Sequence, residues 1–99
     1  MNPMRELTNE ELSELEKFSY AQLKLSEIAI ILGVNETDLI QLALNAGNPV
    51  FDAYQRGRLR AKSEINTSII QAAAAGSTPA QNLAIGLINK HEADLENKS

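Results

Sequence analysis

The stretch of sequence that decides the fold runs from residue 26 to residue 42 and reads Ser26-Glu-Ile-Ala29-Ile-Ile-Leu-Gly33-Val34-Asn35-Glu36-Thr37-Asp38-Leu39-Ile-Gln41-Leu42. A small residue at Ala29 lets two helices cross closely, and Gly33 allows the sharp turn between them. Apolar residues recur at the spacing that fills a core shared by both helices: Ile28, Leu32, Val34, Leu39 and Leu42. The pattern predicts a helix-turn-helix over residues 26–45. An ordinary helical corner, packed in a bundle that binds no DNA, is the alternative interpretation.

Capping residues indicate where the N-terminal helices begin. Thr8 is followed three residues later by Glu11, which predicts a capping box at the start of a first helix. Ser26 is the expected cap of a second helix, and Asn35 is the expected cap of a third. Gly47 can adopt the left-handed conformation that ends this third helix. We therefore expect three short helices in the first half of the chain.

The second half of the chain predicts two longer helices. Pro49 suits the first turn of a helix, because its missing N–H has no partner there. Gly57 would cost this helix roughly 1 kcal/mol relative to Ala, so we expect another backbone to approach closely at that position. Thr78 is the expected cap of the last helix, with Pro79 in the first position and Gln81 as the capping-box partner. Because the connection is short, the two helices should pack as an antiparallel hairpin.

Together these signals predict an all-α fold in a single domain over residues 1–99. A helix-turn-helix head of three short helices occupies residues 7–47, and an antiparallel two-helix hairpin occupies residues 49–96. A hairpin with an Ala-rich stretch cannot cover all of its apolar surface, so we expect the chain to form a homo-oligomer. The face expected to mediate this contact contains Ile65, Ile69, Leu83 and Leu87.

The composition argues against catalysis and against bound metals or cofactors. The chain contains no cysteine and a single histidine, His91, so a cysteine nucleophile and thiolate metal sites are excluded. His91 lies beside Glu92 near a predicted helix end, where we expect it to be structural or exposed. No apolar run approaches membrane-spanning length, and no stretch resembles a signal peptide. We expect a cytoplasmic, non-enzymatic protein without a cofactor and without membrane contact.

The charges are unevenly distributed along the chain. The formal net charge is −4, which taken alone would repel the phosphates of nucleic acid. Residues 49–76 are the exception, since they hold four basic and two acidic side chains. On one helix the basic residues would form two rows that attract phosphate, Arg56 with Arg60 and Arg58 with Lys62. A solvated face whose cations pair with Asp52 and Glu64 is the alternative interpretation.

The third predicted helix would present its N-terminal side chains to base edges if it entered the major groove. These side chains are Asn35, Glu36, Thr37 and Gln41. Thr37 and Gln41 could read base edges, and Glu36 could accept a hydrogen bond from cytosine. We interpret Asp38 as part of the helix start, since a carboxylate there interacts favourably with the helix dipole.

The order of these motifs resembles that in the small subunit of phage terminase and its relatives. The resemblance covers residues 25–90 approximately and rests on three short motifs: Ile28-Ala29-Ile-Ile-Leu-Gly33-Val34, Ala53-Tyr54-Gln-Arg56-Gly57-Arg58 and Ile70-Gln-Ala-Ala-Ala-Ala-Gly76-Ser-Thr-Pro79-Ala80-Gln81. It implies DNA recognition at a packaging site, assembly into an oligomer, and delivery of DNA to a large subunit with ATPase and nuclease activities. By position, residues 35–41 would form the recognition helix, with Tyr54 and Gly57 on the helix packed beside it. The acidic residues of this recognition helix depart from the family pattern.

The residues and the resemblance together predict sequence-directed binding of double-stranded DNA by a phage or prophage adaptor that recognises a packaging site as a terminase small subunit. The expected partners are duplex DNA, further copies of the chain and a terminase large subunit, in the cytoplasm of a bacterial host cell. Two alternatives stay open. One is a small transcriptional regulator, and the other is a protein–protein interaction module in which Glu36, Asp38 and the arginines bind charged partner surfaces.

Overall fold

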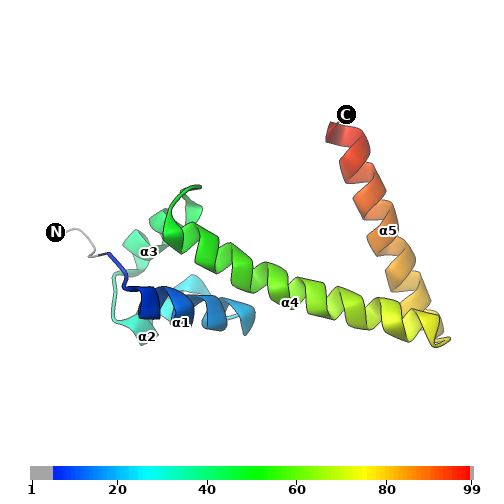
Figure 1. Ribbon diagram of the computed structural model, residues 1–99, viewed down its shortest axis with the longest axis horizontal. Helices are drawn as coiled ribbons and strands as arrows, with labels where there is room; N and C mark the ends of the chain where they lie inside the picture. Colours follow the sequence, from blue (N-terminus) through cyan, green and yellow to red (C-terminus); the bar gives the residue numbers. More distant parts are fainter. Residues whose placement is uncertain (1–5, 99) are drawn as a thin grey trace. The chain divides into compact units, whose positions relative to one another are not determined.

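The computed structural model describes residues 6–98 of the chain, and the side chains of residues 6–92. It contains five α-helices and, within the described residues, no strand (Figure 1). The helices are α1 (Asn9–Tyr20), α2 (Leu25–Leu32), α3 (Glu36–Leu44), α4 (Pro49–Ala74) and α5 (Thr78–Lys98). The all-α prediction is confirmed. Residues 1–5 and residue 99, which the single-domain prediction includes, lie outside the described part of the chain.

The helices divide into two compact units, residues 1–61 and residues 62–99. The border lies inside α4. The first part of α4 buries side chains in the first unit: Val50, Ala53 and Ala61, together with Gly57. The first unit therefore contains α1, α2, α3 and the beginning of α4. The division into a head over residues 7–47 and a hairpin over residues 49–96 stays a prediction. No helix in residues 6–98 is long and apolar enough to cross a membrane.

The capping predictions for α1 and α3 are confirmed. At the start of α1, the Glu11 N–H donates to Thr8 Oγ1 over 3.1 Å, and the Thr8 N–H donates to Glu11 Oε1 over 3.0 Å. At the start of α3, the Asp38 N–H donates to Asn35 Oδ1 over 3.0 Å. These bonds satisfy N–H groups that have no partner within their own helix.

The capping prediction for α2 is wrong by two positions. The helix begins at Leu25, and Lys24 rather than Ser26 is the flanking residue. The Glu27 carboxylate accepts the Lys24 N–H over 2.8 Å. This bond satisfies the N–H of Lys24, so the helix begins directly after Lys24. Ser26 therefore lies within the first turn of α2 rather than before it.

The capping prediction for α5 is wrong by one position. The helix begins at Thr78, so Ser77 is the residue that precedes it. Ser77 Oγ accepts the Ala80 N–H over 3.4 Å, and its carbonyl accepts the Gln81 N–H over 2.9 Å. The Gln81 side-chain amide donates to the Ala73 carbonyl over 3.2 Å. Adjacent hydroxyl residues offer the same chemistry, so sequence alone does not choose between them.

The core of the first unit lies where its helices meet. Leu15, Ile28 and Leu39 are fully buried, and Val50 and Ala53 of α4 belong to the same apolar cluster. Complete burial of one such large side chain contributes roughly 1.5–3 kcal/mol relative to its exposed state. The core therefore stabilises the arrangement of all the helices that surround it.

The helices α2 and α3 pack against each other across a short connection, residues 33–35. As predicted, the chain turns at Gly33, which ends α2 in the left-handed conformation with φ +69°. The Val34 N–H donates to the Ala29 carbonyl over 3.0 Å. Ala29 is itself buried, as expected for a small residue where two helices pack closely. The connection is therefore fixed by the left-handed turn at Gly33, by the hydrogen bond from Val34 to Ala29, and by buried side chains in both helices.

The second unit consists of the end of α4 and α5. The chain turns at Gly76, which has φ +101°. Ala80 and Ala84 are the buried apolar residues among those of this unit whose side chains are described. Five large apolar side chains are half exposed or more: Ile65, Ile70, Leu83, Ile85 and Ile88. Antiparallel packing of α4 against α5 stays a prediction.

Candidate nucleic-acid interface

The helix α3 separates buried from exposed side chains along its length. Leu39 and Ala43 are buried in the first unit. Glu36, Thr37 and Gln41 are exposed, as expected for residues that could meet a partner. Thr37 and Gln41 are four positions apart, so they project from the same face of the helix. The three candidate base-reading residues therefore lie on solvent-facing positions of α3.

Asn35, the fourth predicted residue of this group, has a structural role at the helix start. Its side-chain oxygen accepts the Asp38 N–H and caps α3. Bidentate reading of adenine by an asparagine uses both the amide oxygen and the amide nitrogen. Asn35 could read a base in this way only by sharing or giving up the oxygen that caps the helix.

The first part of α4 lies directly against α1 at Gly57. A Cβ atom at this position would lie 2.8 Å from the Ser19 Cβ and 2.9 Å from the Tyr20 backbone nitrogen, and still closer to the Glu16 carbonyl oxygen. Real Cβ atoms essentially never come within 3.0 Å of such atoms. Gly57 therefore allows the two helix backbones to touch, and the expected close approach is confirmed.

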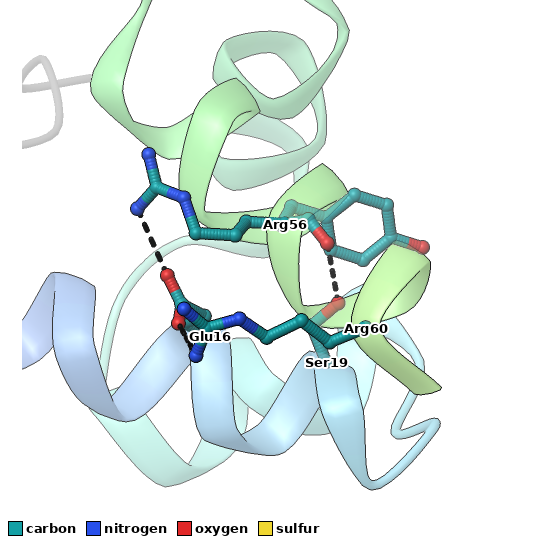
Figure 2. Close-up of polar contacts among 5 residues, drawn as sticks. Glu16, Ser19, Arg56 and Arg60 are labelled. Carbon is teal, nitrogen blue, oxygen red and sulfur yellow. Dashed lines mark hydrogen bonds and ion pairs between the residues drawn. The ribbon is translucent and has the colours of Figure 1, made fainter. Parts of the chain in front are cut away.

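Ser19 joins the same two helices by a hydrogen bond that the sequence did not predict. Its side chain is completely buried. Figure 2 shows its hydroxyl facing α4, where Ser19 Oγ donates to the Tyr54 carbonyl over 2.5 Å. The bond satisfies a hydroxyl that would otherwise be costly to bury. No local pattern distinguishes this serine from an exposed one.

The Glu16 carboxylate of α1 pairs with two arginines of α4. Glu16 Oε1 lies 2.9 Å from Arg56 Nη1, and Glu16 Oε2 lies 3.1 Å from Arg60 Nη1 (Figure 2). The sequence interpretation offered Asp52 and Glu64 as the acids of this face, and it missed Glu16. A residue 40 positions away in the chain gives no sequence signal for such a pair. Arg56 and Arg60 are thus one row of the predicted basic group, and a carboxylate lies between them.

The other row of the basic group has different surroundings. The Arg58 Cζ lies 5.4 Å from the centre of the Tyr54 ring, and Arg58 Nη1 donates to Tyr54 Oη over 3.3 Å. A guanidinium over an aromatic face keeps its positive charge. Lys62 is exposed and lies just past the border, in the second unit. Within the described residues, neither Arg58 nor Lys62 forms an ion pair.

An open hollow of about 380 Å³ lies between α1 and the beginning of α4. Its lining combines two acids with one base, Glu16, Asp52 and Arg56. The Glu16–Arg56 pair is therefore reached from solvent on this side. Among the described side chains, those of residues 6–92, no group of three or more His, Cys, Asp or Glu is placed to hold a metal ion.

Comparison of the chain with protein-family models, with curated proteins and with solved structures gives no match. The resemblance to terminase small subunits thus rests on the sequence motifs alone.

Proposed function

We propose that the chain binds double-stranded DNA, with α2 and α3 as a helix-turn-helix and α3 as its recognition helix. The observation that supports this most directly is the division of α3 into two faces. Leu39 and Ala43 fix one face in the core, while Thr37 and Gln41 project together from an exposed face. The short connection through Gly33 is of the kind that joins the two helices of a helix-turn-helix, which supports the proposal.

Phosphate attraction would come from α4. Arg58 and Lys62 are both exposed and four positions apart, and neither forms an ion pair in the described residues. Arg56 and Arg60 share the Glu16 carboxylate, so their attraction for phosphate is reduced. Phosphate contacts position a protein on the duplex without reading sequence. We therefore assign positioning to α4 and sequence reading to α3.

The biological role we propose is that of a phage or prophage adaptor, such as a terminase small subunit acting with a large subunit. The resemblance of the three sequence motifs supports this assignment. The adaptor would need no catalytic residues of its own, because the large subunit of that family supplies the ATPase and nuclease activities.

Self-association through the second unit is part of the same proposal. Folded units shorter than roughly 40 residues usually need oligomerisation, disulfides or a metal for stability. Residues 62–99 are a unit of this size, and Ile65 and Leu83 within it are both 57% exposed. A second copy that packs on the face with Ile65, Ile69, Leu83 and Leu87 would cover this surface. Sedimentation velocity at micromolar concentration tests it, and a clean monomer would remove the oligomer while leaving DNA binding by the head unaffected.

Fluorescence anisotropy of the full chain with a labelled duplex tests DNA binding directly. We expect weak binding at about 50 mM salt, with a logarithmic salt slope close to 0.9 units for every phosphate neutralised. Replacing both Arg58 and Lys62 with Gln should flatten the slope. Thr37→Ala and Gln41→Ala should instead change the preference among sequences by roughly 1–3 kcal/mol per lost base contact and leave the slope nearly unchanged. Absence of duplex binding would refute the proposed function.

A protein–protein interaction module is the second candidate. Ile30 and Ile31, adjacent in α2, are 81% and 52% exposed, and contiguous exposed apolar surface marks protein interaction sites. The same anisotropy experiment separates the two candidates, because an interaction module has no salt-dependent affinity for duplex DNA.

A further inference from the structure

We infer that Glu16 lowers the affinity of the proposed DNA-binding surface for phosphate, because its carboxylate competes with phosphate for Arg56 and Arg60. The inference rests on the proposed function. It assigns to α1 a role in binding that no basic residue or motif of that helix suggests, namely to limit sequence-independent attraction of the arginines for DNA.

The geometry places one carboxylate against two guanidinium groups. Gly57 lies between Arg56 and Arg60 in the chain, and its close contact with α1 brings this turn of α4 next to Glu16. Each carboxylate oxygen then binds a different arginine, Oε1 to Arg56 and Oε2 to Arg60. Arginine binds carboxylate and phosphate through the same N–H donors, so one anion can replace the other.

The pairs are accessible to an incoming anion. The side chains of Arg56 and Arg60 are 56% and 65% exposed, while that of Glu16 is 21% exposed. The hollow lined by Glu16 and Arg56 opens the first pair to solvent. A phosphate that approaches this surface meets the positive charges of Arg56 and Arg60 and the negative charge of Glu16, and Asp52 of the same hollow adds a second negative charge. Exposed ion pairs of this kind are weak and screened by salt, so an anion with more charge can displace the carboxylate.

The consequence is a lower affinity for DNA of any sequence. Attraction to phosphate supplies essentially all of non-specific binding and a large share of specific binding, so the carboxylate lowers both affinities. The ratio between them is unchanged, because phosphate contacts carry no sequence information. A merely structural Glu16 would stabilise the contact of α1 with α4 and leave the salt dependence of binding unchanged.

The decisive comparison is between Glu16→Gln and Glu14→Gln in the full chain. Both variants remove one negative charge from α1, but Glu14 is exposed and contacts neither arginine. On a random-sequence duplex at about 50 mM salt, we expect Glu16→Gln to bind roughly three- to tenfold more tightly than Glu14→Gln, since two weak ion pairs are released. Its salt slope should be steeper by about one to two units, because two further arginines become available to phosphate.

Two additional variants make the result interpretable. Replacing Arg56 and Arg60 with Gln in the Glu16→Gln background should abolish the gain. Glu16→Ala should reproduce the gain, and circular dichroism of each variant checks that the helices are retained. If Glu16→Gln binds no better than Glu14→Gln, or binds more weakly because the carboxylate orients the arginines, the inference is overturned.

A second ligand distinguishes failure of the inference from failure of the proposed function. Inorganic polyphosphate presents phosphate charges without bases or grooves. If no variant binds duplex DNA, the proposed function is lost, and the comparison of Glu16→Gln with Glu14→Gln on polyphosphate decides the inference by the same criterion.

Discussion

The two parts of α4 belong to one continuous helix, yet they differ in what surrounds them. Before residue 61, the buried positions Val50, Ala53 and Gly57 follow the spacing of one helical face and lie in the first unit. After residue 61, Ile65 is 57% exposed and Ile70 is 50% exposed. Both parts have apolar residues at helical spacing, so periodicity alone does not distinguish a face that is covered from one that is not. What differs is that α1 and the core of the first unit cover the apolar face of the first part.

The contrast also separates two sources of helix stability. In the first part of α4, packing against α1 and the core holds the helix in place. In the second part, the described residues give mainly local hydrogen bonds and the turn at Gly76. Isolated helices are only marginally stable in water, and most of their stability in proteins comes from packing of an apolar face. The second part should therefore depend on a partner much more than the first.

The largest test of this contrast removes one leucine from each unit. Leu15→Ala should lower the free energy of unfolding by about 2–5 kcal/mol, because Leu15 is fully buried in the core of the first unit. Leu83→Ala should change it by no more than about 0.5 kcal/mol in the monomer, because Leu83 is 57% exposed. Urea denaturation followed by circular dichroism measures both. A large loss for Leu83→Ala that grows with protein concentration would show that this face is covered by another copy.

A smaller effect is expected from the same substitution at two helical glycines. Gly57→Ala should destabilise the chain by about 1–3 kcal/mol, because the new methyl group would overlap backbone atoms of α1. Gly86→Ala in α5 should stabilise its helix by roughly 0.5–1 kcal/mol, because nothing lies within 4 Å of the added Cβ. Thermal unfolding compares the two. Equal effects of the same sign would contradict the difference in packing between these positions.

The smallest effect concerns Asn35, where capping and base reading can be separated. Asn35→Ala should cost about 1 kcal/mol of stability, because it removes the side-chain acceptor of the Asp38 N–H. Asn35→Ser retains a side-chain acceptor without adding a charge and should be nearly neutral in the free protein. If duplex affinity follows stability in both variants, Asn35 acts only as a cap. A loss of affinity in Asn35→Ser with unchanged stability would instead indicate contact with DNA.

The sequence predicted those features that depend on neighbours in the chain. The residues concerned all act within one helical turn: Thr8 with Glu11 at the start of α1, Gly33 at the end of α2, Asn35 before α3 and Pro49 at the start of α4. Gly57 was predicted to contact another backbone because an interior glycine is costly unless something compensates. The identity of that backbone, α1, could not be predicted, because it depends on how distant segments pack.

The features that could not be predicted from the sequence are of two kinds. Some involve neighbouring residues with the same chemistry, and others involve residues far apart in the chain. Ser77 and Thr78 offer the same hydroxyl chemistry one position apart, and the structure selects the first. Glu16 belongs to an acidic stretch that was expected to be solvated, and only the packing of α1 against α4 brings it to Arg56 and Arg60. The sequence therefore identifies the basic residues of α4, but not that Arg56 and Arg60 share a carboxylate while Arg58 lies over the Tyr54 ring.

The contact of α1 with α4 also has a kinetic consequence for folding. It joins positions 40 residues apart, whereas α1 packs on α2 and α2 packs on α3, their neighbours in sequence. Contacts between neighbours close short loops and form quickly, while a distant contact must first overcome a larger loss of chain entropy. We therefore expect docking of α4 to be the late step in assembly of the first unit. Substitutions at Ser19 and Gly57 should then accelerate unfolding much more than they slow folding, because their contacts are absent until after the transition state.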